Sequence, residues 1–379
     1  MKFRKFTNLF SLLIVFLIAF IAISCKESSS PTGPQIKTLN SETIEKLQTA
    51  TDEIMMNTQA PGLMAYIGVD GEGEGIYITR GVSNLVTSEP MSINNYFRIG
   101  SITKTITTEA VLILVDEGKI DLNQSISFYL PDLKIPSGEK ITIPMLANMT
   151  SGLYDYADED LINSLSNSHG QKVFTPDQLL TGAFSYPMRF EPGTKYEYCN
   201  TNYLLLGLLI TKVTGKPVMD IFTEKIFQPL GMKNTFWPNT SYMPYPYSHG
   251  YFLESNNSLT DVTNWNPSWA DAAGCLISNF SDLKIWAKEV NERKLLSDKM
   301  KSVRYAWVDG DIPGVTSSGF GLEKAWDWIG KTGAIMGYNS QLFYNPIKKI
   351  TILINTNSMD GYPASSTFAA FANILAPIK

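Results

Sequence analysis

The chain has 379 residues, of which 44% are hydrophobic and 12% aromatic, proportions typical of a packed globular protein. Its formal net charge is −5, and this acidic balance argues against nucleic acid as a partner. A chain of this length exceeds the usual single hydrophobic core, so we expect two lobes around a cleft.

The first residues have the pattern of a secretory leader. A basic head precedes residues 9–23, which are apolar except for one serine and are shorter than the roughly 20 residues that span a bilayer. The segment Ala22-Ile-Ser-Cys25 resembles a bacterial lipobox. This resemblance implies a lipoprotein signal peptide over residues 1–24 and a lipidated Cys25. It places the protein in the bacterial cell envelope, lipid-anchored and facing the periplasm or the surface.

Residues 25–38 are expected to form a flexible tether, because they are rich in serine, proline and charged residues. The twelve residues 26–37 would reach about 40 Å when fully extended. Removal of residues 1–24 takes away three positive charges and leaves a net charge of −8 on the mature chain. We place the folded catalytic domain at residues 39–379.

Apolar patterning predicts strands at residues 63–69 and 76–80, near the start of this domain, and at 340–344 and 350–355, near its end. The stretches between them are mostly helical in pattern. Because the two strand groups lie near opposite ends, we predict an α+β fold. One antiparallel sheet flanked by helices is formed from both chain ends, and a mostly helical lobe is inserted between them.

The first of three short polar motifs is Ser101-Ile-Thr-Lys104. It follows a strand-like stretch and opens a helix expected over residues 102–117, which Gly118 can terminate. Residues 111–115 are apolar on every side, so this helix is predicted to be buried. Ser101 therefore lies at a helix N-terminus, where unpaired N–H groups favour negative charge, and Lys104 lies on the same helical face.

Two further Ser-x-x-Lys segments are interpreted as structural. Ser137 of the segment 137–140 lies in a Pro-Ser-Gly turn. Ser281 of the segment 281–284 is predicted to be the N-cap of a helix over residues 282–290.

The second and third motifs are Tyr198-Cys-Asn200 and Lys331-Thr-Gly333, and each pattern occurs once. A lysine such as Lys104 becomes a base at neutral pH when desolvation or a second cation, here Lys331, lowers its pKa. A tyrosine between two ammonium groups would also have a lowered pKa, so Tyr198 and Lys104 are both candidate proton carriers. The three motifs together indicate acyl transfer through a serine ester.

The surroundings of these motifs resemble a known superfamily. Residues 191–236, which include Tyr198-Cys-Asn200 and Pro229-Leu-Gly-Met232, are similar to the serine β-lactamases and penicillin-binding proteins. The nearest likeness is to class C β-lactamases and D-alanyl-D-alanine carboxypeptidases, and Met149-Thr-Ser-Gly-Leu153 adds to it. The resemblance covers residue 39 to the C-terminus and implies a β-lactamase/transpeptidase-like fold.

This resemblance implies catalytic roles for three residues and a substrate-binding role for a fourth. Ser101 would attack the carbonyl carbon of the substrate. Lys104 and Tyr198 would shuttle its proton to the leaving group, and Asn200 would hold the substrate amide.

The resemblance also implies binding roles along the third motif. Lys331 and Thr332 would face a substrate carboxylate, and Gly333 would leave space for the substrate against the strand edge. The backbone N–H groups of Ser101 and Ala334 would form the oxyanion hole.

Two positions depart from the family pattern, and the two histidines are not predicted to take part in the chemistry. Cys199 stands where relatives commonly have Ser or Ala, which predicts sensitivity to oxidation, and Asn148 stands where they often have His. Whether Cys199 pairs with Cys275 stays open. His169 and His249 lie in polar or turn-rich segments and are interpreted as surface residues. The sequence therefore predicts no metal and no cofactor.

The favoured activity is that of a D-alanyl-D-alanine carboxypeptidase or a related penicillin-binding enzyme, because a lysine beside a hydroxyl suits a carboxylate. A class C-like β-lactamase, an esterase or D-amidase, and a non-enzymatic penicillin sensor or cell-wall-binding protein share the same motifs. The expected partners are a small-molecule or peptidoglycan-peptide substrate and, through Cys25, the membrane, but not nucleic acid. The oligomeric state stays open.

Overall fold

The structure is a computed structural model that describes residues 39–310 and 316–377. The predictions for the signal peptide (1–24), the lipidated Cys25 and the tether (25–38) concern residues outside this part of the chain. In the part that the structure describes, no helix is both long and apolar enough to cross a membrane.

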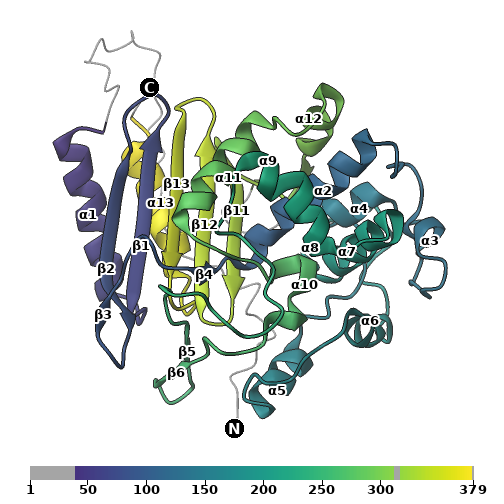
Figure 1. Ribbon diagram of the computed structural model, residues 1–379, viewed down its shortest axis with the longest axis horizontal. Helices are drawn as coiled ribbons and strands as arrows, with labels where there is room; N and C mark the ends of the chain where they lie inside the picture. The colour runs from purple at the N-terminus through teal and green to yellow at the C-terminus, as the bar shows by residue number, and fades with distance from the viewer. Residues whose placement is uncertain (1–38, 311–315, 378–379) are drawn as a thin grey trace, which may run out of the picture.

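A nine-stranded antiparallel sheet forms one side of the molecule (Figure 1). Its strand order is β3-β2-β1-β13-β12-β11-β10-β9-β8. The strands are β1 (Gly62–Val69), β2 (Ile76–Asn84), β3 (Glu89–Pro90), β8 (Val308–Asp309), β9 (Ser317–Ser318), β10 (Glu323–Ala325), β11 (Trp328–Ile335), β12 (Tyr338–Asn345) and β13 (Ile350–Thr356). Strand β1 pairs with β13 from Leu63 opposite Thr356 to Val69 opposite Ile350. Both chain ends therefore build one sheet, which confirms the predicted α+β fold.

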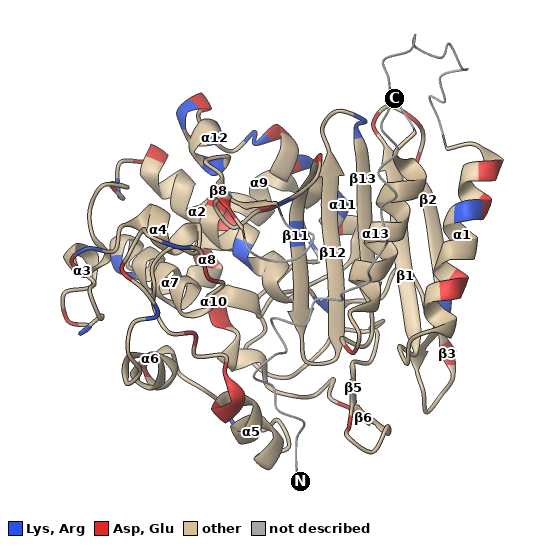
Figure 2. Cartoon of the chain, turned by 180° about the vertical axis from the view of Figure 1, so that it is seen from behind, with Lys and Arg blue, Asp and Glu red and all other residues tan. Residues whose placement is uncertain are grey.

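Helices cover both faces of this sheet, and this explains why β1, β12 and β13 carry no charged residue (Figure 2). Helices α1 (Ser41–Met56) and α13 (Pro363–Leu375) pack together on one face, and α11 (Phe280–Glu292) lies on the other. Side chains of β13 alternate between them: Ile352 and Ile354 join the core under α13, whereas Leu353 joins the core on the α11 side.

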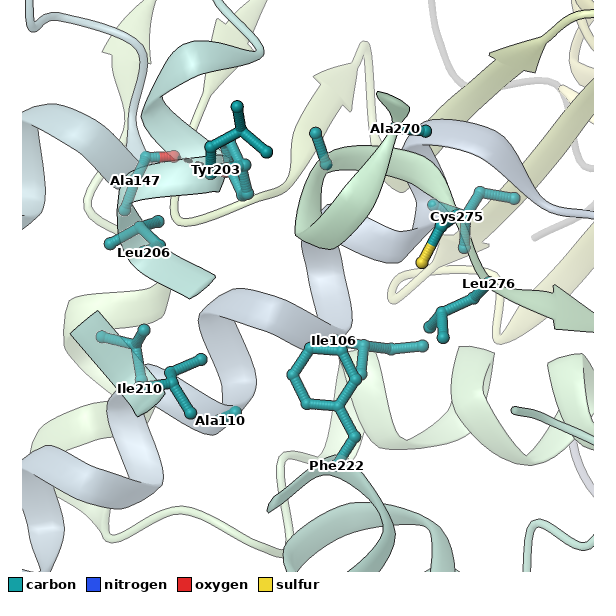
Figure 3. Close-up of a cluster of buried hydrophobic side chains, with 14 of the residues drawn as sticks. Ile106, Ala110, Ala147, Tyr203, Leu206, Ile210, Phe222, Ala270, Cys275 and Leu276 are labelled. Atoms are coloured by element: carbon teal, nitrogen blue, oxygen red, sulfur yellow. Dashed lines mark hydrogen bonds between the residues drawn. The ribbon is translucent and has the colours of Figure 1, made fainter. Parts of the chain in front are cut away.

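The rest of the chain forms the predicted helical lobe. At its centre α2 (Thr103–Asp116) packs against α7 (Thr201–Thr214), and Figure 3 shows Ala110 of α2 beside Ile210 of α7. The Tyr203 hydroxyl donates to the carbonyl oxygen of Ala147 at 2.8 Å. The other helices are α3 (Ile126–Tyr129), α4 (Ile143–Ala147), α5 (Glu159–Asn167), α6 (Pro176–Phe184), α8 (Val218–Phe222), α9 (Gln228–Leu230), α10 (Asp271–Gly274) and α12 (Asp298–Arg304), with a π-helical turn η3 (Thr223–Phe227).

Short elements join the lobe to the sheet. They are β4 (Phe97–Arg98) paired with β7 (Ile277–Ser278), β5 (Tyr251–Leu253) paired with β6 (Leu259–Asp261), and two 3₁₀ turns, η2 (Gly100–Ile102) and η4 (Pro267–Trp269). The helix predicted at 102–117 is observed as η2 followed by α2, and nearly all of α2 is buried, as its apolar run predicts.

The prediction that Ser281 caps a helix is wrong by two residues. The side chain of Asn279 accepts a hydrogen bond from the backbone nitrogen of Asp282 at 3.2 Å, and α11 begins at Phe280. Strand β7 ends at Ser278, so the helix starts almost at once and buries Phe280 in its first turn. Asparagine is at least as good an N-cap as serine, and the earlier start uses it.

Candidate active site

Two close backbone approaches hold the Ser101 turn against the edge of β11. Gly100 has a φ of +55°, and a Cβ atom there would lie 2.8 Å from the backbone nitrogen of Ala334. A Cβ atom on Gly333 would lie 2.1 Å from the carbonyl oxygen of Ile99. This corrects the expectation that Gly333 leaves space for substrate, because the backbone of Ile99 fills that space.

The hydroxyl of Ser101 lies between two candidate proton carriers. Its Oγ is 2.6 Å from the hydroxyl of Tyr198 and 3.0 Å from Nζ of Lys104. Lys104 Nζ also donates to Oδ1 of Asn200 and to the carbonyl oxygen of Ala273, both at 2.7 Å. The structure thus brings together the three residues predicted to be catalytic and Asn200, which is predicted to bind substrate. Those roles themselves stay predictions.

Burial controls the protonation of Lys104. Its side chain is completely buried, and this desolvation lowers its pKa well below the usual value. The positive charge of Lys331 lowers the pKa further, whereas the carboxylate of Asp155 opposes it. Both effects named in the sequence analysis therefore act on this lysine, and desolvation is the larger.

The expectation of a lowered pKa for Tyr198 is wrong. Its ring does lie between the two ammonium groups, with its centroid 4.9 Å from Nζ of Lys104 and 5.1 Å from Nζ of Lys331. Desolvation outweighs this attraction and raises the pKa of Tyr198 well above its usual value. These opposite directions favour Lys104 over Tyr198 as the group that accepts the Ser101 proton.

A partly buried carboxylate orients Asn200. The side-chain amide nitrogen of Asn200 donates to Oδ2 of Asp155, and its backbone nitrogen donates to Oδ1, each at 3.0 Å. These bonds turn Oδ1 of Asn200 towards Lys104. Desolvation raises the pKa of Asp155 to about 6. The sequence analysis missed this residue, although it lies two positions after the Met149–Leu153 segment that carries part of the resemblance.

A buried carboxylate lies beside the Lys-Thr-Gly strand. Glu323 of β10 lies opposite Gly330 in the hairpin with β11 and forms an ion pair with Lys331. Its other oxygen accepts a hydrogen bond from the backbone nitrogen of Thr332 at 2.9 Å, and the Thr332 hydroxyl donates to Oε1 of Gln341 at 3.1 Å. No motif in the sequence marks Glu323, because only the hairpin brings it beside Lys331.

The N–H group of Ala334 points towards the same strand edge. The bond from Thr332 to Glu323 shows that this backbone N–H is directed away from β12, and alternation along an antiparallel strand directs that of Ala334, two residues on, the same way. Ser101 and Ala334 line one small cleft. The oxyanion hole assigned to their backbone nitrogens stays a prediction with this geometry in its favour.

This cleft is mainly aromatic and apolar. We call it the serine cleft, and its lining residues are Ser101, Tyr156, Asn200, Trp269, Ala270, Ala273, Gly274, Ala334 and Ile335. Tyr156 is 4% exposed, and its hydroxyl has no hydrogen-bond partner among the described residues. A buried hydroxyl without a partner is costly unless a ligand satisfies it, so Tyr156 is a candidate substrate-binding residue that the sequence analysis missed.

The remaining reactive side chains are two thiols and two histidines. Cys199 and Cys275 are buried free thiols, and burial raises the pKa of both, so the expected oxidation sensitivity of Cys199 is not supported. His169 is exposed, whereas His249 is partly buried and its Nδ1 pairs with Asp261 at 2.7 Å. No cluster of three or more metal-ligating side chains occurs in residues 39–310 and 316–377.

Comparison with known proteins identifies the family of this chain. The model of the Beta-lactamase family matches residues 47–372, so the chain belongs to that family. It is 25% identical over 338 residues to Protein flp of Staphylococcus aureus strain MW2, a match that covers 84% of this chain and 64% of that protein. It is 27% identical over 245 residues to the putative penicillin-binding protein PbpX of Bacillus subtilis, with 64% and 57% covered.

Solved structures with a similar fold include two amide-hydrolysing enzymes. A D-stereospecific amidohydrolase from a Streptomyces species superposes with a TM-score of 0.78 at 29% identity, covering 86% of this chain and 97% of that one. The D-amino acid amidase of Ochrobactrum anthropi SV3 superposes with a TM-score of 0.77 at 25% identity, covering 88% and 99%. The fold and family together define a serine hydrolase of the β-lactamase type.

Proposed function

We propose that the protein hydrolyses an amide bond on the carbonyl side of a D-amino acid residue through an acyl-enzyme on Ser101, as a D-amidase. The observation that carries the proposal is Ser101 Oγ held 3.0 Å from a buried lysine of lowered pKa and 2.6 Å from a protonated tyrosine. The likeness of the chain to a D-stereospecific amidohydrolase and a D-amino acid amidase supports the choice of substrate class.

The proton path follows from this geometry. Neutral Lys104 accepts the Ser101 proton while Oγ bonds to the substrate carbonyl carbon, and the N–H groups of Ser101 and Ala334 stabilise the resulting oxyanion. Tyr198 donates its proton to the leaving nitrogen as the carbon–nitrogen bond breaks, and the proton held by Lys104 then restores Tyr198. In deacylation, water attacks the ester carbon and gives a proton to Lys104, and this proton passes to Oγ of Ser101 as the ester bond breaks and the acid is released.

The second candidate is the D-alanyl-D-alanine carboxypeptidase or penicillin-binding activity favoured by the sequence. The presence of Lys331 and the likeness to PbpX, which is described as a putative penicillin-binding protein, support it. A class C-like β-lactamase uses the same residues and differs in how fast water reaches the acyl-enzyme.

One experiment tests the proposal. Purified protein from residue 36 onward is incubated with D-phenylalanine amide, L-phenylalanine amide, an N-acyl-D-alanyl-D-alanine and a penicillin, and product release and intact mass are followed. We expect hydrolysis of the D-amide in preference to the L-amide, and a loss of roughly 10⁴-fold or more in Ser101→Ala. A persistent penicillin adduct with no amide hydrolysis would favour the second candidate.

Ser137→Ala is the matched control, because it removes the serine of another Ser-x-x-Lys segment that lies in a turn. We expect this variant to keep full activity. If Ser101→Ala retained the wild-type rate on every substrate, the acyl-enzyme mechanism would be refuted.

A further inference from the structure

Protein groups already engage the three donors of the Lys-Thr-Gly strand that would grip a substrate carboxylate. Lys331 Nζ pairs with Oε1 of Glu323, the backbone nitrogen of Thr332 donates to Oε2 of Glu323, and the Thr332 hydroxyl donates to Gln341. The carboxylate of Glu323 thus lies where that of a substrate would bind.

We infer that Glu323 determines specificity by excluding substrates whose leaving group carries a carboxylate, and so directs the site to neutral leaving groups such as ammonia, an alcohol or an amino acid amide. This inference rests on the proposed acyl-enzyme function and names its substrate class. Two carboxylates beside one ammonium group leave a net negative charge, and the second enters against repulsion.

Burial makes Glu323 hard to displace. Its side chain is 4% exposed and that of Lys331 is 5% exposed. Both carboxylate oxygens are held, one by the ammonium of Lys331 and one by the backbone of Thr332, so the side chain cannot rotate away without leaving a buried donor unpaired. Separation of a buried ion pair is strongly unfavourable.

The serine cleft offers no substitute cation. None of its lining residues in the described part of the chain is a lysine, an arginine or a histidine. Its unsatisfied polar group is the neutral hydroxyl of Tyr156, beside Trp269 and Ile335. Such a surface binds a neutral carbonyl or an apolar side chain without the cost of desolvating a charge.

The test compares N-acetyl-D-alanyl-D-alanine with its C-terminal amide, which differ only in a carboxylate against a carboxamide. We expect the wild-type kcat/KM for the amide to exceed that for the acid by at least tenfold. In Glu323→Gln, which keeps the side-chain size but removes the competing charge, the acid-to-amide ratio should rise at least tenfold. Glu323→Ala should move this ratio in the same direction.

Glu139→Gln is the matched control, since it removes one carboxylate from an exposed turn; its ratio should equal that of the wild type. Circular dichroism confirms that each variant is folded. A wild-type preference for the acid, or an unchanged ratio in both Glu323 variants, would overturn the inference.

A second readout separates this inference from the proposed function. The rate at which Ser101 is acylated by benzylpenicillin and by its neutral methyl ester is measured by intact mass, which requires no turnover. Absence of any D-substrate hydrolysis would refute the proposed function alone. The acylation ratio would still decide the role of Glu323, because Glu323→Gln should raise the relative rate of the carboxylate-bearing penicillin at least tenfold.

Discussion

At the scale of single residues, the chemistry depends on how Lys104 is surrounded. A completely buried ammonium group is unstable unless its hydrogen bonds are satisfied, and Ser101, Asn200 and Ala273 accept from it. Asp155 is the opposing charge that raises the pKa of this lysine most, and it acts through Asn200 as a positioning residue. It touches no reacting atom itself.

We predict two effects of Asp155→Asn. Loss of the acceptor that orients Asn200 should lower kcat/KM by roughly tenfold or more. Activity requires neutral Lys104, so the acid limb of the pH profile follows its pKa. Because Asp155 raises that pKa, its removal should shift the limb to lower pH.

The pH profile of kcat/KM checks this prediction. Asp132→Asn, which removes an exposed carboxylate far from the serine, is the control and should leave the profile unchanged. A shift of the acid limb to higher pH would show that Asp155 does not stabilise the charged form of Lys104.

At the scale of elements, the proposed chemistry requires η2 and β11 to touch. Gly100 and Gly333 lie on opposite sides of this contact, and a side chain on either would meet backbone atoms that cannot rotate away. The contact sets the distance between the Ser101 nitrogen and the Ala334 nitrogen, on which the predicted oxyanion hole depends. Substrate access is a separate matter and lies in the serine cleft.

Gly333→Ala should therefore separate the two elements. We predict a loss of roughly 10²-fold in kcat/KM, because an error of about 1 Å in a catalytic constellation costs that much. Overpacking should also lower the free energy of unfolding by roughly 1–3 kcal/mol. Kinetics and urea denaturation measure the two effects.

Gly182→Ala is the matched control for this prediction. Gly182 lies in α6 and a Cβ atom there would meet nothing within 4 Å, so alanine should be neutral or stabilise the helix by roughly 0.5–1 kcal/mol. Wild-type activity in Gly333→Ala would mean that the strand edge can move without harm.

At the scale of the whole molecule, one buried ion pair ties the catalytic helix to the surrounding lobe. Glu109 of α2 and Arg304 of α12 pair with both side chains completely buried. One oxygen of Glu109 and Nε of Arg304 have no further partner among the described residues. Desolvation raises the pKa of Glu109 to about 7, which shows that the carboxylate is only partly compensated.

A double-mutant cycle tests how much this pair stabilises the fold. Glu109→Leu or Arg304→Met alone should lower the free energy of unfolding by roughly 3–5 kcal/mol, because each leaves a buried charge unpaired. The double variant should be about as stable as the wild type or more so. Urea denaturation at pH 8, where Glu109 is ionised, measures all four proteins.

The exposed pair of Glu42 and Lys46 provides the control. Its side chains are 73% and 60% exposed, so Glu42→Gln should leave the free energy of unfolding unchanged within experimental error. Additive losses in the double variant would show that Glu109 and Arg304 do not act as a pair.

Local pattern alone determined a large part of this protein. The strand segments, the buried helix that begins beside Ser101 and the placement of one sheet across both chain ends follow from apolar periodicity and turn residues, which act over a few neighbours. The order of the three motifs was sufficient to bring Ser101, Lys104 and Tyr198 into one predicted site. Their hydrogen bonds in the structure agree with that prediction.

Only the tertiary structure decided the electrostatics. The pKa of Tyr198 rises because distant segments exclude water from it, and sequence spacing carries no information on desolvation. Asp155 reaches the site through a loop contact and Glu323 through a strand pairing, so no sequence motif marks either residue. The sequence therefore identified the candidate reacting groups, and long-range packing decided how burial shifts their pKa values and which charges lie beside them.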